Sequence, residues 1–376
     1  MAQALNSAGE PRVPDAKPSG VIEPVQYLRA LAALMVVFSH ANDQLRTPGL
    51  GYTPELGHFG VDLFFVISGF IMLVITEQRE QTPHDFLLSR ILRVAPNYWF
   101  YTTLVAVLAV AAPSVFRATA FTLPHYLQSL LFIAHENPAD PGSTSPLLKL
   151  GWTLNYEMFF YVVFTAAIAL SFARRLLITT AALGSLIVLG WLFAPTDPVA
   201  NFYTRDIMLE FLFGMGIGWL YLHGRTGPRS ALYFFGFGIL CLLWANVSAG
   251  FGVMQSSVRG LVWGVPAAGV LFLALGLQPA RGWVGRVLKG LGDASYTIYL
   301  FHLFPLSGLR LIWLKIGLAT GYPLATYVFV LLALVVVATS GYAAYWLIER
   351  PATRLAHSLR QRLLSADRKR VTHPVQ

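Results

Sequence analysis

The chain has 376 residues, of which 56% are hydrophobic and 12% are charged, and its formal net charge is +9. A mean hydropathy of +0.59 excludes an ordinary soluble protein. Because long apolar runs recur from Val25 to Ile348, the sequence predicts an all-α, polytopic bundle of membrane helices and not a barrel of alternating strands. The basic residues lie scattered between these runs, so the net charge indicates membrane topology and no nucleic-acid partner.

About ten apolar runs are long enough to cross a bilayer as helices. They cover residues 25–41, 58–76, 96–112, 152–172, 176–194, 206–222, 231–249, 257–277, 294–313 and 323–348. Residues 120–134 are apolar but too short to cross, which favours an interfacial or re-entrant helix. If both termini are cytoplasmic, most lysines and arginines fall on the inner side, as basic loops prefer.

The same pattern divides the chain into three parts. Residues 1–22 are predicted to form a disordered cytoplasmic tail, residues 23–350 a transmembrane domain and residues 351–376 a basic cytoplasmic tail. We therefore expect the membrane helices and their short loops to carry any chemistry. The single cysteine, Cys241, excludes an intrachain disulfide and a cysteine-based metal site, and we expect no metal.

The first apolar run carries an arginine near one end and a histidine at the other. Arg29 and His40 are eleven residues apart, so in a helix they share one face, about 16 Å apart along the axis. This separation is too long for a hydrogen bond, so the two side chains need different roles near the inner and outer edges of the membrane. The alternative is a snorkelling arginine and an interfacial histidine without function.

Two carboxylates are predicted to lie in the outer half of the bilayer with His40. Asp62 is within a turn of the outer end of its helix, and Glu157 is about one and a half turns inside its own. A carboxylate bound to one imidazole nitrogen leaves the other nitrogen basic, which suits general-base catalysis. The alternatives are a helix cap for Asp62 and, for Glu157 beside Tyr156 and Tyr161, a structural bond between helices.

Charged residues expected on the inner side have a different character. Arg90 and Arg93 are spaced to share a helical face just before the third membrane helix. Two guanidinium groups on one face suit bidentate binding of phosphate, although topology alone also favours arginines at this edge.

Two further ionisable residues are secondary candidates. His302 is predicted near the middle of the ninth helix, where an imidazole usually makes a hydrogen bond between helices. Glu349 meets the inner interface beside Arg350, which favours a structural ion pair. The glycines of GMGIGW at 214–219 do not form a dinucleotide fingerprint and indicate close helix packing.

Six stretches together resemble the acyltransferase-3 family of bacterial membrane acyltransferases. They are Arg29 with ten residues before His40, GVDLFFVISGF at 60–70, the pair Arg90 and Arg93, WTLNYEMFFY at 152–161, SYTIYLFH at 295–302 and IERP at 348–351. They occur in the family's order and cover nearly the whole chain. The second and fourth stretches are most similar to members that acetylate exopolysaccharides of the succinoglycan type.

The resemblance implies an enzyme of the bacterial cytoplasmic (inner) membrane. It would transfer an acyl group, most commonly acetyl, from cytoplasmic acyl-CoA to a hydroxyl of an exported polysaccharide or of its lipid-linked oligosaccharide precursor. Acyl-CoA would be a donor substrate, with no permanently bound cofactor. The resemblance carries over Arg29 and His40 as an essential pair, and Arg90 and Arg93 as arginines on the donor side.

The residues and the resemblance lead to one hypothesis. Arg29, Arg90 and Arg93 hold the phosphates of acyl-CoA, and His40 removes the proton of the acceptor hydroxyl, with Glu157 and then Asp62 orienting it. Direct transfer and a transient acyl-histidine are both compatible with the sequence. A glycan transporter or flippase that transfers no acyl group would also need many spans, but it should show a repeat, and we find none.

Overall fold

The computed structural model describes residues 21–45, 55–79, 81–112, 119–226, 233, 236–237, 240, 244, 258–318, 323–356 and 358. Over these residues the chain forms helices and no strand, which confirms the all-α prediction. Most of the helix predicted at 231–249, and most of both predicted tails, lie outside the described residues.

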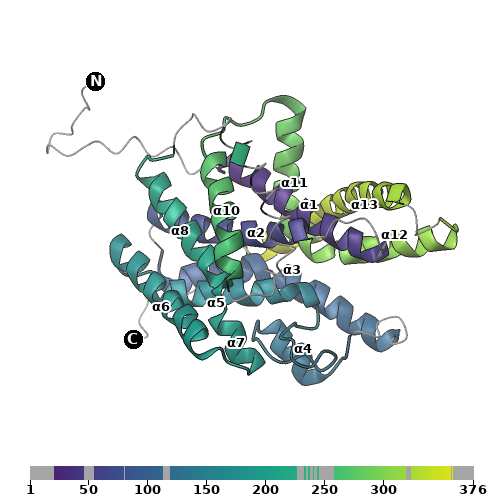
Figure 1. Cartoon of the computed structure of the whole chain (residues 1–376), viewed down its shortest axis with the longest axis horizontal. Helices are drawn as coiled ribbons and strands as arrows, with labels where there is room; N and C mark the ends of the chain where they lie inside the picture. The colour runs from purple at the N-terminus through teal and green to yellow at the C-terminus, as the bar shows by residue number, and fades with distance from the viewer. Residues whose placement is uncertain are drawn as a thin grey trace, which may run out of the picture.

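The long helices follow one another with short connections. They are α1 (Glu23–Leu45), α2 (Glu55–Gln78), α3 (Pro83–Ala111), α5 (Trp152–Ala167), α6 (Phe172–Phe193), α8 (Leu209–Leu222), α10 (Arg259–Ala274), α11 (Gly282–Phe301), α12 (Leu303–Lys315) and α13 (Pro323–Ala344). Two short helices, α4 (Leu123–Leu130) and α7 (Pro198–Thr204), lie together at one edge of the bundle (Figure 1).

Several of these helices are long and apolar enough to span a membrane. Among the described residues there are four by length and composition, or five if the bent pair α11 and α12 counts as one span. The chain is therefore a helical membrane protein, while the count of ten spans and the cytoplasmic termini stay predictions. The predicted short helix at 120–134 is present as α4, whose eight residues are too few to cross.

Three helix boundaries differ from those predicted. The helix α3 begins at Pro83, because the Thr82 hydroxyl caps it by accepting from the Asp85 amide at 3.1 Å. The predicted ninth span instead bends by 66° at His302, where Pro305 in the first turn of α12 has no amide to continue the ladder. The last helix continues through a π-helical segment to residue 356, past the predicted domain boundary at 350.

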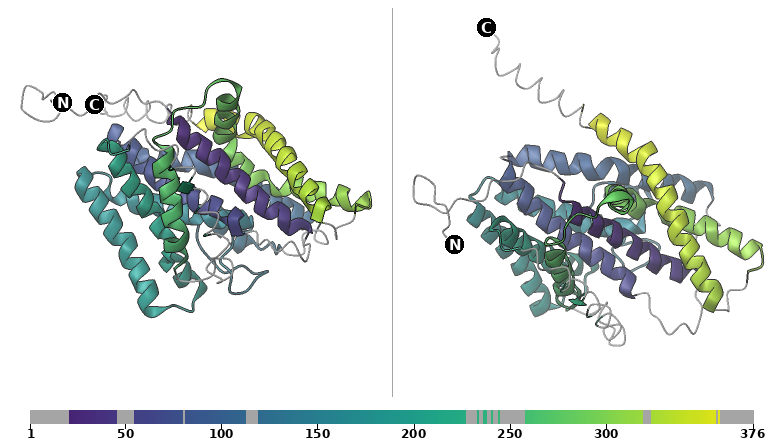
Figure 2. Two further views of the ribbon diagram at one scale, coloured as in Figure 1. Left: turned by 45° about the horizontal axis from the view of Figure 1, so that its top comes forward. Right: turned by 90° about the horizontal axis from the view of Figure 1, so that it is seen from above.

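The helix α1 lies at the centre of the arrangement. It packs against α2, α11 and α13, and α2 packs on its other side against α8 and α10 (Figures 1 and 2). The contact between α2 and α8 requires glycine, since a Cβ at Gly69 or Gly214 would lie 2.0 Å from a backbone oxygen of the opposite helix. This confirms close packing at Gly214, the first glycine of GMGIGW.

Candidate active site

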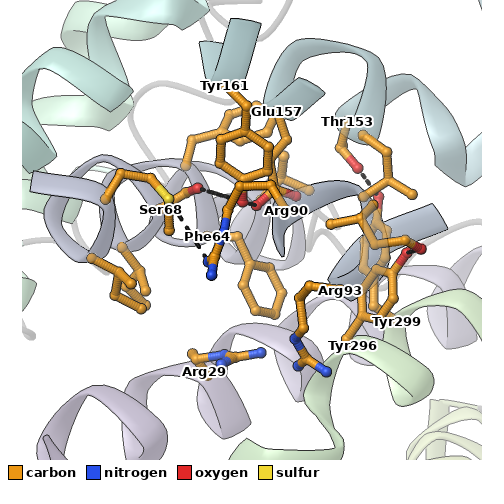
Figure 3. A pocket seen from close by; sticks show the side chains of 17 residues that line it. Arg29, Phe64, Ser68, Arg90, Arg93, Thr153, Glu157, Tyr161, Tyr296 and Tyr299 are labelled. Carbon is orange, nitrogen blue, oxygen red and sulfur yellow. Dashed lines mark hydrogen bonds between the residues drawn. The ribbon is translucent and has the colours of Figure 1, made fainter. Parts of the chain in front are cut away.

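A cavity of about 150 Å³ lies between α1, α2, α3, α5 and α11. Figure 3 shows guanidinium groups from α1 and α3 on one side and a carboxylate from α5 on another. We call this site the arginine cavity; its charged and polar lining consists of Arg29, Ser68, Arg90, Arg93, Thr153, Glu157, Tyr161, Tyr296 and Tyr299. The remaining lining residues are apolar, mostly from α2.

The three predicted donor-side arginines meet in this cavity. Arg29 makes no hydrogen bond or ion pair with any residue that the structure describes. Arg90 places Nε 3.2 Å from the Ser89 hydroxyl and Nη1 3.9 Å from the Met72 sulfur. Arg93 lies three residues further along the same helix face, as the spacing predicts, although both arginines lie within α3 and not before it.

Glu349 holds Arg93 in place. One of its carboxylate oxygens pairs with the Arg93 guanidinium, and the other accepts from the Thr297 hydroxyl. Glu349 is 1% exposed and ends the π-helical segment, so it is fixed on both sides. The predicted pair with Arg350 is wrong, since that guanidinium lies 3.7 Å from the centre of the Trp346 ring.

Glu157 faces the arginines and is held by two hydroxyl groups. Its Oε1 accepts from Ser68 at 3.1 Å and from Tyr161, one turn further along α5. The prediction that Glu157 meets His40 is therefore not supported by its contacts, because the carboxylate belongs to the arginine cavity. Ser68 and Tyr161 were not predicted, although both lie within the stretches that carry the family resemblance.

His40 lies in a second group, with His302 and His58, which we call the histidine cluster. The ring centres of His40 and His302 are 4.9 Å apart, and that of His58 is 6.5 Å from His40. His40 Nδ1 lies 2.9 Å from the Val36 carbonyl. Because a carbonyl can only accept, Nδ1 carries the proton and Nε2 is the basic nitrogen.

His302 has the same tautomer and no second partner. Its Nδ1 donates to the Tyr299 carbonyl at 2.7 Å, and its buried Nε2 has no hydrogen-bond partner in the described structure. This differs from the predicted bond between helices, since the Tyr299 carbonyl belongs to the helix that ends at His302. Tyr299 also lines the arginine cavity, so it connects that cavity to the histidine cluster.

The comparison with protein families decides the class. A family model described as an acyltransferase domain matches residues 23–344, which include both groups of residues. The chain belongs to the acyltransferase-3 family. This membership favours an enzyme over the transporter considered above.

Relatives of this acyltransferase-3 protein act on or produce extracellular polymers, by their names. It is 38% identical over 315 residues to the exopolysaccharide production protein ExoZ of Rhizobium meliloti, covering 82% of this chain and 94% of the relative. It is 28% identical over 309 residues to the peptidoglycan O-acetyltransferase OatA of Listeria monocytogenes. That match covers 73% of this chain and about half (48%) of OatA. No solved structure matches the chain.

Asp62 lies in another part of this acyltransferase, away from the partners of His40. It pairs with Arg259 at 2.8 Å, and Glu210 lies 3.6 Å from the same guanidinium. Asp206 accepts from the Gly260 amide at 2.6 Å beside them. We call these four residues, Asp62, Asp206, Glu210 and Arg259, the Arg259 cluster. It was missed because Arg259 was assigned to an outer loop, whereas it is 4% exposed.

The remaining secondary candidate, Tyr156, is a packing residue. Its ring stacks on Phe202 with centres 3.8 Å apart and planes 15° apart, and its side chain does not line the arginine cavity. Tyr161, the other tyrosine beside Glu157, takes the position in the cavity. Both lie on α5, and the sequence pattern does not indicate which of them faces the site.

Proposed function

We propose that the protein is a membrane O-acyltransferase that uses acyl-CoA, most commonly acetyl-CoA, as donor and a hydroxyl of an exported polysaccharide or its lipid-linked precursor as acceptor. The observation that carries this proposal is the arginine cavity. Three guanidinium groups reach one small cavity, and Arg29 is left without a protein partner. Guanidinium groups in such a site favour a ligand with several phosphates, which acyl-CoA provides.

The order of groups along α1 suits the shape of this donor. Arg29 is near the start of the helix and His40 is three turns further on, on the same face. A donor with its phosphates at Arg29 would extend its pantetheine arm past Tyr299 and Phe64, which line the cavity and lie 6.0 Å apart between ring centres. Its thioester would then reach the histidine cluster.

His40 is the proposed general base. Its Nε2 takes the proton of the acceptor hydroxyl, whose oxygen forms a bond to the thioester carbonyl carbon. The carbon–sulfur bond then breaks, and the departing CoA thiolate takes the proton from the imidazolium, so atoms and charge balance. His302 packs against His40 and restrains its ring, while Glu157 balances part of the arginine charge and positions the donor.

The acceptor class rests on the relatives. ExoZ is named for exopolysaccharide production and OatA for acetylation of peptidoglycan, and sugar hydroxyls are common to both polymers. Of the two, ExoZ is the more similar and is matched over nearly its whole length. We therefore propose an exopolysaccharide or its lipid-linked precursor as acceptor, in the inner membrane.

The test is acyl transfer by the purified protein in lipid nanodiscs. Labelled acetyl-CoA and polysaccharide extracted from a strain lacking the protein are the substrates, and mass spectrometry identifies the group gained by the polymer. We expect transfer by the wild type and a loss of about 10²- to 10⁴-fold in His40→Ala. Wild-type rates in a folded His40→Ala protein would overturn the role of His40, and a folded wild type that uses no acyl-CoA would overturn the donor.

A further inference from the structure

A second cavity, also of about 150 Å³, adjoins the arginine cavity at the start of α1. It lies between α1 and α2, and Ile71 lines both cavities. Its walls are mainly aliphatic, from Ile22 on α1 and Val74 and Ile75 on α2, and two glutamines, Gln26 and Gln78, are its polar lining. We call it the glutamine groove.

Gln26 carries an unused acceptor into this groove. Its side-chain Oε1 is buried and has no hydrogen-bond partner in the described structure. A buried amide oxygen without a partner costs free energy that a ligand donor would recover. A ligand for this position should therefore offer an N–H or O–H group and an otherwise apolar, flat or compact body.

The position of Gln26 along α1 relates the groove to the donor. Ile22, Gln26 and Arg29 follow at intervals of four and three residues, so they form one stripe of the helix. Gln26 is about 4.5 Å before Arg29 along the axis and about 21 Å before His40. The order along this helix is thus an apolar groove with an amide, then a guanidinium, then an imidazole.

We propose that the glutamine groove binds the adenine ring of the acyl-CoA donor. This inference rests on the proposed function. Acyl-CoA presents adenine, phosphates and thioester in the same order in which α1 presents the groove, Arg29 and His40. A glutamine amide pairs with adenine by accepting from the N6 amino group and donating to N7, and aliphatic side chains cover the faces of the ring.

The test compares two donors in the Gln26→Met variant. Methionine keeps the length of the side chain and removes both hydrogen-bonding groups. We expect the KM for acetyl-CoA to rise about fivefold to tenfold with kcat unchanged, as for a contact made equally in ground and transition states. The KM for acetyl-4′-phosphopantetheine, which lacks the nucleotide, should not change.

Two further variants complete the design. Ile75→Trp narrows the same groove without touching Gln26, and we expect the same selective loss with acetyl-CoA. Gln128→Met on α4, far from the groove in sequence and structure, is the matched control and should leave both donors unaffected (Figure 1). Elution of each variant as a monodisperse peak in detergent shows that it is folded, so a selective KM change is not a folding defect.

The outcomes separate this proposal from the function on which it rests. If the folded wild type transfers acetyl from neither donor, the proposed function fails and the adenine site fails with it. If it uses both donors and Gln26→Met changes them equally or not at all, only the adenine site is wrong. Inhibition of the wild type by 3′,5′-ADP with an unchanged acetyl-CoA KM in Gln26→Met would assign the groove to a free nucleotide and also overturn the proposal.

Discussion

The arginine cavity and the Arg259 cluster contain the same residue types in opposite arrangements. In the Arg259 cluster three carboxylates surround one guanidinium, and the side chains of Arg259, Asp62 and Glu210 are 5%, 0% and 0% exposed. In the arginine cavity three guanidinium groups share two carboxylates, and the Arg93 side chain remains 33% exposed. The first group is filled by its own partners, whereas the second is left for a ligand.

This difference shows how to interpret charged residues in membrane helices. A charge inside a span is a functional candidate by default, because its burial is costly. Asp62 and Arg29 both meet that criterion, yet Asp62 is neutralised by a neighbouring helix and Arg29 is not. The partner of a buried charge, more than its depth, therefore distinguishes a site that joins helices from one that binds a substrate.

The largest effect is expected from breaking the Arg259 cluster. Arg259→Met would leave Asp62 and Glu210 buried without their cation, which costs about 3–5 kcal/mol of stability. We expect little folded protein, or a strongly lowered melting temperature by size exclusion after heating. Arg29→Met is the matched control and should melt like the wild type. Equal melting of the two variants would mean that the two groups do not differ as we describe.

The converse experiment measures donor binding. Arg29→Met removes a guanidinium that no described residue uses, so its loss should affect the donor and not the fold. We expect the KM for acetyl-CoA to rise about 10-fold to 100-fold, as for loss of a hydrogen bond between charged groups. Arg29→Lys should recover part of the affinity. An unchanged donor KM with reduced acceptor affinity would place Arg29 at the other substrate.

A smaller effect is expected from Glu349, which acts through Arg93. Glu349→Gln keeps the size of the side chain and the bond to Thr297 but loses the charge that holds Arg93. We expect the donor KM to change by about fivefold, or about 1 kcal/mol, with kcat nearly unchanged. Thr297→Val, which removes only the other bond of Glu349, is the control and should have less effect. A fall in kcat at constant KM would contradict this positioning role.

The features along a single helix were predictable from the sequence. The apolar run that carries Arg29 and His40 is one continuous helix, and the spacing of Arg90 and Arg93 does place them on one face of α3. Both predictions depend only on the helical repeat and on local sequence. The short length of α4 was likewise readable from the run of apolar residues.

The partners of these residues were not predictable in the same way. Sequence position gives the depth of a residue in a membrane helix, but the rotation of that helix against its neighbours depends on tertiary packing. For this reason Asp62 and Glu157, predicted to meet His40, lie with Arg259 and Ser68 instead. The pair Arg93 and Glu349 joins residues 256 positions apart, and no local pattern indicates it.

The smallest effect extends the comparison to a buried pair without charge, outside the spanning helices. His135 Nδ1 donates to the Ile133 carbonyl, so its Nε2 must accept the proton of His125 Nδ1 at 2.6 Å. Burial, and then the neighbouring His135, lower the pKa of His125 from 6.5 to about 4. The unfolded chain therefore binds a proton at a higher pH than the folded protein does.

By linkage, the stability from this neutral pair is complete above about pH 6.5 and is lost as the pH falls toward about 4. His125→Gln can still donate to His135 but does not titrate at this position. We expect the melting temperature of the wild type to fall by about 2–4 °C more than that of the variant between pH 7.5 and pH 5. Parallel melting curves over this range would mean that the pair accepts a proton without loss, and that burial at this site does not require neutrality.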